Sequence, residues 1–179
     1  MSGKISEFAT RFKIIHWVMA VLILTMLIAG QNFGGPMPED ERRFSLAMHA
    51  TLGVFVILLL IRRLRYVLSG RAQRPEHDLP GWQKSVSRLV QYGIYAMLVF
   101  VPVTGILTAV HSKVAVKVFG LFNIAQGDAS RFDVIRPFHE TGTKVLAVLL
   151  VLHVGAALYH GLIRRDGVFR SMWFRRRMR

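Results

Sequence analysis

Four apolar runs, each long enough to cross a lipid bilayer, constrain this chain more than any other feature of its sequence. They lie at about residues 13–31, 44–65, 87–110 and 138–163. A helix needs about 20 mostly apolar residues to span the hydrocarbon core, and a helix satisfies its own backbone polar groups there. The sequence therefore predicts an all-α protein, an integral membrane four-helix bundle, with residues 1–179 forming a single domain.

Lysine and arginine are distributed unequally over the two sides of such a bundle. Of the 24 Lys and Arg residues, 17 fall in the N-terminal arm, the second connection and the tail from Arg164 to Arg179, and 7 fall on the other side. Positively charged connections stay in the cytoplasm. We therefore expect both the N and C termini to be cytoplasmic, in a multi-pass protein surrounded by membrane lipid. The first run is too long for a signal peptide, and no A-x-A cleavage site follows it.

The composition excludes several kinds of cofactor site. The chain contains no cysteine, which rules out disulfides, thiolate zinc sites, cysteine-ligated iron–sulfur clusters and covalently attached c-type haem. The net charge of +14 resembles that of a nucleic-acid-binding protein. However, the basic residues lie beside apolar runs, and few aromatic residues in polar stretches are available to stack on bases. We expect no nucleic-acid partner, and any cofactor must be held by histidine or by packing.

Four histidines lie at membrane depth, two near each side. His16 is near the inner side in the first run, and His49 is near the outer side in the second. His139 begins the fourth run at the outer side, and His153 follows 14 residues later. Fourteen residues rise about 21 Å and return to within about 40° of the same helix face. Depth alone therefore pairs His16 with His153 and His49 with His139.

Two histidine pairs on facing helices are typical of b-type haem sites in helix bundles. The sequence thus predicts two haem b groups, whose iron is the metal. Gly53, Gly142 and Gly155 lie near these histidines and would give a porphyrin room, although small residues also serve ordinary helix packing. The alternatives for the histidines are hydrogen-bonded structural residues, or a zinc or proton pathway, but zinc usually takes more than two imidazoles.

The other histidines and one carboxylate are less constrained. His160 is seven residues after His153 on the same face, and it is either a contact for a quinone carbonyl or its proton, or an ordinary interface histidine. Glu140 is the one carboxylate well placed within the runs. His77 and His111 are interpreted as surface residues.

Two further stretches carry structural expectations. The third connection, residues 111–136, contains "KVAVKVFGLF", which suits a short segment at the outer membrane surface or a partly buried lid. In the third run, Pro102 and Gly105 of "VPVTG" are expected to kink the helix or to serve simple packing.

Several motifs spread over nearly the whole chain resemble one known family. They are "IIHW", "MHATLG", "VPVTG", "VFGLF" and, most specifically, "FHETGTKVLAVLLVLHVGAALYH". With them the chain resembles the bacterial cytochrome b561 family, a four-helix di-haem membrane fold also seen in the cytochrome b subunits of hydrogenases. The resemblance implies that His16, His49, His139 and His153 are the axial haem ligands, in the pairing given above.

The length and loop arrangement are similar to those of stand-alone family members that act as superoxide oxidases. This resemblance implies that superoxide is the small substrate on the outer face and that ubiquinone is the electron acceptor. Outer basic residues would either draw the anion inward or be ordinary solvated charges. These residues are Arg42, Arg43, Lys113, Lys117, Arg131 and Arg136.

Two other functions fit the same pattern. The first is a membrane anchor and electron-carrier subunit that docks a hydrogenase or dehydrogenase as its soluble redox partner. The arginine-rich tail "RRDGVFRSMWFRRRMR" is then either the docking face or a lipid-headgroup contact. The second is a transporter without haem that uses the histidines for protons or metal ions.

Overall fold

The computed structural model describes residues 8–72, 75, 78–127 and 129–174. His77, which the sequence places on the surface, lies outside this part of the chain. Within it, four helices are long and apolar enough to cross a membrane. They are α1 (Thr10–Gly30), α2 (Glu39–Leu68), α3 (Gly81–Val110) and α4 (Phe132–Leu158). The prediction of an all-α, four-helix membrane bundle is confirmed.

All four long helices begin earlier than their apolar runs. Pro38 precedes α2, whose first turn holds Glu39, Asp40 and Glu41. Carboxylates stabilise the positive end of a helix dipole, so a polar first turn prolongs the helix beyond its apolar part. Pro80 precedes α3 in the same way. The apolar runs therefore mark the part of each helix at membrane depth rather than its full length.

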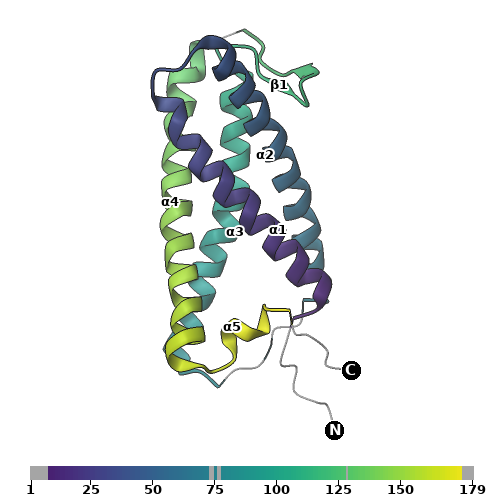
Figure 1. Ribbon diagram of the computed structural model, residues 1–179, viewed down its shortest axis with the longest axis vertical. Coiled ribbons are helices and arrows are strands. Elements are labelled where there is room, and N and C mark those ends of the chain that lie inside the picture. The colour runs from purple at the N-terminus through teal and green to yellow at the C-terminus, as the bar shows by residue number, and fades with distance from the viewer. Residues whose placement is uncertain (1–7, 73–74, 76–77, 128, 175–179) are drawn as a thin grey trace.

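The helices pack as two pairs. α3 lies along α4, and α1 packs on α2, while α1 runs obliquely across the bundle (Figure 1). A small apolar core joins the pairs at mid-height. It consists of Ile15, Met19, Ile23, Val56, Leu60, Leu98 and Leu146. Leu146 lies seven residues from both His139 and His153, so this core separates the two ends of the bundle. Large apolar side chains cover the outside of the helices, for example Val151, which is 72% exposed, as a surface in contact with lipid requires.

A small β-hairpin closes one end of the bundle (Figure 1). Its strands β1 (Lys117–Val118) and β2 (Phe122–Asn123) pair antiparallel. Gly120 supplies the left-handed backbone conformation of the turn, with φ of 71°. The hairpin is held to α2, because the backbone N–H of Phe119 donates to Thr51 Oγ1 at 2.8 Å and the Phe119 ring contacts Phe55. The apolar stretch expected at the membrane surface is thus a hairpin anchored on the second helix.

The chain enters and leaves the bundle at the opposite end. There α4 continues into a π-helical stretch, η3 (Tyr159–Arg164), and the chain reverses into α5 (Val168–Ser171). The returning segment lies against α1, since Lys13 Nζ donates to the Trp173 carbonyl at 2.8 Å and Trp17 Nε1 donates to that of Met172 at 3.0 Å. Short 3-10 turns, η1 (Gln31–Gly34) and η2 (Ala129–Arg131), complete the connections at the hairpin end. Below, the two ends are called the hairpin end and the α5 end.

Candidate haem-binding histidine pairs

One histidine pair lies toward the α5 end. His16 of α1 and His153 of α4 have ring centroids 6.2 Å apart, with the ring planes inclined by 66°. His16 meets Arg63 of α2, whose Nη1 lies 3.2 Å from His16 Nδ1. The Arg63 Nε donates to the Tyr95 hydroxyl of α3 at 2.9 Å. This pair is therefore surrounded by all four long helices.

The second pair lies toward the hairpin end. His49 of α2 and His139 of α4 have centroids 6.3 Å apart, with ring planes inclined by 85°. His139 Nδ1 is 3.0 Å from the Val101 carbonyl of α3, and since that carbonyl only accepts, Nδ1 donates the hydrogen. A neutral imidazole protonated on Nδ1 leaves Nε2 free as a metal ligand. His49 Nδ1 is buried with no hydrogen-bond partner.

Glycines near the histidines have distinct structural roles. A Cβ added at Gly105 would lie 3.0 Å from His139 Cε1, so glycine is what lets this ring lie against α3. A Cβ at Gly142 would lie 2.9 Å from Phe100 Cδ1, which shows that Gly142 serves the packing of α4 on α3. A Cβ at Gly155 would meet nothing within 4 Å. Of these glycines, only Gly105 makes room for a histidine.

The spacing of both pairs fits a metal ion held between two imidazoles. A metal–imidazole bond is about 2.0–2.1 Å long and the ring nitrogen lies about 1.1 Å from the ring centroid, so two rings on opposite sides of one metal have centroids about 6.2–6.4 Å apart. The two separations are 6.2 and 6.3 Å. In the part of the chain described, no cluster of three or more His, Cys, Asp or Glu is arranged to hold a metal ion. The two imidazoles of each pair could therefore hold the metal ion of a cofactor, and the cofactor would supply the other ligands.

His160 lies at the α5 end and has a partner that the sequence analysis did not identify. Its Nδ1 is 2.5 Å from Asp166 Oδ2, and Arg164 Nε is 3.6 Å from the same oxygen. Burial alone would raise the pKa of Asp166, but the hydrogen bonds from His160 and from the Val168 backbone N–H, with the charges of His160 and Arg164, lower it below its ordinary value of 3.8. Asp166 is thus an anion at neutral pH and orients the His160 ring.

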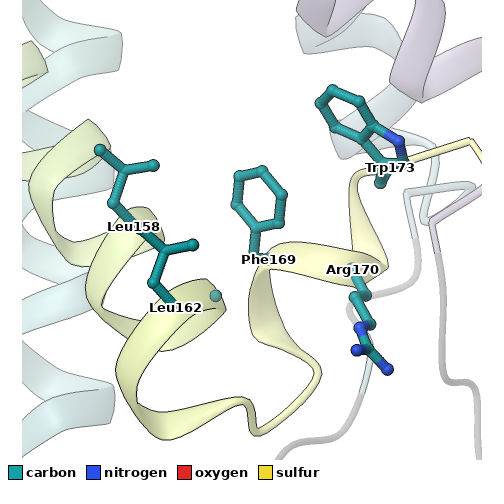
Figure 2. Close-up of a pocket in the computed structure, with 6 residues that line it drawn as sticks. Leu158, Leu162, Phe169, Arg170 and Trp173 are labelled. Atoms are coloured by element: carbon teal, nitrogen blue, oxygen red, sulfur yellow. The ribbon is translucent and has the colours of Figure 1, made fainter.

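A cavity of about 290 Å³ lies between the end of α4, η3 and α5. Figure 2 shows Leu158 and Leu162 on one wall and Phe169 and Trp173 on the other. Gly161 and Arg170 complete its lining. The cavity is mostly apolar, since the Arg170 side chain points away from the space between the leucines and the aromatic rings (Figure 2), and such a cavity suits a flat, weakly polar ligand.

The remaining candidates lie away from the pairs. Glu140 accepts a hydrogen bond from Arg136 Nε at 2.6 Å, and both side chains are about half exposed, so this carboxylate is on the outside of α4. His111 is the C-terminal cap of α3, where its Nδ1 is 2.9 Å from the Leu107 carbonyl.

Arg63 is the functional candidate that the sequence analysis missed, because it was counted only as one of the cytoplasmic charges. A signal for it was present: Arg63 follows His49 by 14 residues, the spacing that also separates His139 from His153. The same helical arithmetic therefore places it on the helix face of His49, about 21 Å along α2.

The fold and the two histidine pairs define a class, that of membrane four-helix bundles built to hold cofactors between helices. The comparisons narrow this class to a family. Residues 7–175 match the family described as prokaryotic cytochrome b561, and the chain belongs to that family. The protein is thus a membrane electron carrier of the prokaryotic inner membrane, in a family that binds b-type haem.

Two relatives in Escherichia coli strain K12 show similarity over most of the chain. "Cytochrome b561 homolog 1" is 26% identical over 170 residues, which cover 91% of this chain and 94% of that protein. "Probable Ni/Fe-hydrogenase 1 B-type cytochrome subunit" is 22% identical over 207 residues, which cover 92% of this chain and 87% of that protein. The similarity therefore includes both a cytochrome b561 homologue and a hydrogenase cytochrome subunit.

Proposed function

We propose that this protein holds two haem b groups, one in each histidine pair, and carries electrons across the inner membrane. The observation that carries the proposal is the matched spacing of the two pairs, 6.2 and 6.3 Å, at opposite ends of one bundle. When bound, haem supplies one-electron redox chemistry, while the protein supplies ligands, burial and hydrogen bonds. His16 and His153 would hold one iron, and His49 and His139 the other.

We further propose that the hairpin end faces outward and that superoxide is the electron donor there. The lysine and arginine distribution along the sequence supports this orientation, since 17 of the 24 fall before or at the start of α1, in or next to the connection between α2 and α3, or after α4. Arg42 on the hairpin side bonds only to backbone carbonyls, those of Phe33 and Gly35, and so keeps its net positive charge. Such charges raise the local concentration of a small anion. By contrast, Lys113 and Arg136 are each paired with a carboxylate.

The proposed acceptor is ubiquinone at the α5 end. The apolar cavity beside η3 offers a place for a quinone ring, and His160, which precedes the lining residue Gly161 in η3 and is oriented by Asp166, would contact a carbonyl oxygen or deliver a proton. The reaction balances when two superoxide anions each lose one electron and become dioxygen. One ubiquinone then takes up both electrons and two protons and becomes ubiquinol.

Haem counting tests the ligand assignment. The purified protein should show two b-type haems per chain. The variants His16→Ala and His153→Ala should each lack one and the same haem, and His49→Ala and His139→Ala should each lack the other. Retention of both haems in any of these variants contradicts the pairing.

A superoxide assay tests the activity. The purified protein is exposed to enzymatically generated superoxide with a ubiquinone analogue present. Haem reduction followed by ubiquinol formation is the expected result. Intact haems that superoxide fails to reduce would show that the donor is another molecule.

A second candidate function is a membrane anchor and electron-carrier subunit. The similarity to a protein named as a probable hydrogenase cytochrome subunit favours it. Purification in mild detergent separates the two candidates, because an anchor brings a stoichiometric soluble dehydrogenase with it, whereas an enzyme is active alone.

A further inference from the structure

One histidine pair lies beside a permanent positive charge. The Arg63 guanidinium is 3.2 Å from His16 Nδ1, and its carbon lies 4.4 Å from the centroid of the Phe12 ring. Tyr95 fixes the other side of the guanidinium by accepting a hydrogen bond from Nε. Arginine stays protonated at any pH at which the protein is folded. Partners on α1 and α3 thus hold one full positive charge next to His16.

No carboxylate among the described residues pairs with this charge. The ion pairs found there lie at the hairpin end, in the first turn of α2 and around α4, or at the end of η3. Arg63 itself is only partly exposed. Its charge is therefore screened less than that of a surface arginine.

The pair at the hairpin end has a hydrogen-bond acceptor beside it, where the other pair has a cation. There His139 Nδ1 donates its hydrogen to the Val101 carbonyl. A hydrogen-bond acceptor at Nδ1 makes an imidazole a more basic ligand, and a more basic ligand favours oxidised iron. A guanidinium has donors only and cannot accept a hydrogen from His16.

We propose that Arg63 raises the reduction potential of the haem held by His16 and His153 above that of the haem held by His49 and His139. Both observations act in this direction, since the positive charge beside His16 favours iron in its lower charge state, while the acceptor at His139 Nδ1 favours oxidised iron in the other pair. The inference rests on the proposed function, because it assumes one haem in each pair. As a consequence, electron transfer from the haem at the hairpin end to the haem at the α5 end, on the side of the proposed quinone cavity, is thermodynamically favourable.

Redox titration of the purified protein, followed by the haem absorption bands, tests this inference without measuring turnover. Variants that lack one haem assign each midpoint to one pair. In Arg63→Met, the midpoint of the His16–His153 haem should fall by at least 59 mV, a tenfold change for one electron, while the other midpoint stays unchanged. An unchanged midpoint for the His16–His153 haem overturns the proposal.

Two further variants separate charge from packing. Arg62→Met removes the neighbouring exposed arginine and should leave both midpoints unchanged. Arg63→Lys keeps the charge and should keep most of the potential, even if Arg63→Met loses the haem. If Arg63→Lys loses haem, or if its midpoint potential falls as far as that of Arg63→Met, the shape of the side chain matters rather than its charge, and the proposal fails.

Haem content and haem potential separate a failure of the proposed function from a failure of the proposed role of Arg63. If the wild-type protein lacks two haems, or if the histidine variants do not remove them in pairs, the proposed function is wrong. If the haems pair as proposed but Arg63→Met leaves the potentials in place, only the role of Arg63 is wrong.

Discussion

Replacing Gly105 by alanine should loosen the haem at the hairpin end without unfolding the protein. The new Cβ would lie 3.0 Å from Cε1 and 3.2 Å from Nδ1 of His139. Carbon atoms in contact normally lie about 3.5–4.0 Å apart, so the ring must move by roughly 0.5 Å. That movement stretches the hydrogen bond from His139 to Val101, which is 3.0 Å long. It also changes the spacing of the ring to His49.

The size of the effect follows from the strain. Overpacking costs about 1–3 kcal/mol and the weakened hydrogen bond about 1 kcal/mol. Alanine stabilises a helix by about 0.5–1 kcal/mol over glycine, but it does so with and without haem, so this gain leaves haem affinity unchanged. A net loss of about 2–4 kcal/mol lowers the affinity of the hairpin-end haem roughly 30- to 700-fold.

The assay compares the rates at which each haem transfers to an excess of apomyoglobin. Gly93→Ala is the matched control, since it lies on the same helix and its new Cβ would meet a flexible side chain, Leu149, at 3.2 Å. The hairpin-end haem should be lost faster in Gly105→Ala alone. Equal rates in wild type and Gly105→Ala, or equal acceleration in Gly93→Ala, would refute the reasoning that His139 depends on this glycine.

The two remaining predictions concern the α5 end. Asp166→Asn should free the His160 ring and lower quinone reduction several-fold while both haems remain. The pKa of Asp166 is lowered in the folded protein, so its interaction with His160 contributes stability fully above the ordinary value of 3.8 and loses it as the pH falls below that value. The quinone reduction rate of the wild type should therefore approach that of the variant only in this acid range. Lys13→Met leaves the Trp173 carbonyl without its donor, and a loss of about 1–3 kcal/mol should appear as faster tryptic cleavage in the returning segment at unchanged haem content.

Helix number and helix depth could be predicted from the sequence because both follow from local rules. Apolar length counts the spans, and the 14-residue spacing puts His139 and His153 on one face of α4. Both rules need only the rise and turn of a helix.

Contacts across the bundle could not be predicted in this way. Whether Gly142 makes room for a cofactor or for Phe100 depends on how closely α3 approaches α4, and no periodicity encodes that distance. The hairpin after α3 was missed because its strands are two residues long, too short for an alternating pattern. Asp166 was overlooked as the partner of His160 because the chain reversal after η3 depends on left-handed residues such as Arg165, which a sequence does not reveal.

The order in which the histidines occur along the chain has a consequence for biogenesis. Each pair takes one ring from α4, and the partner rings come from α1 and α2, at the other end of the sequence. During synthesis, the first two helices enter the membrane long before residue 139 leaves the ribosome. Neither pair exists until the fourth helix has been inserted, so ligation of either proposed haem by both histidines of its pair must follow translation of nearly the whole chain. A product truncated in the third helix would reach the membrane with only His16 and His49 of the four paired histidines, and with neither pair complete.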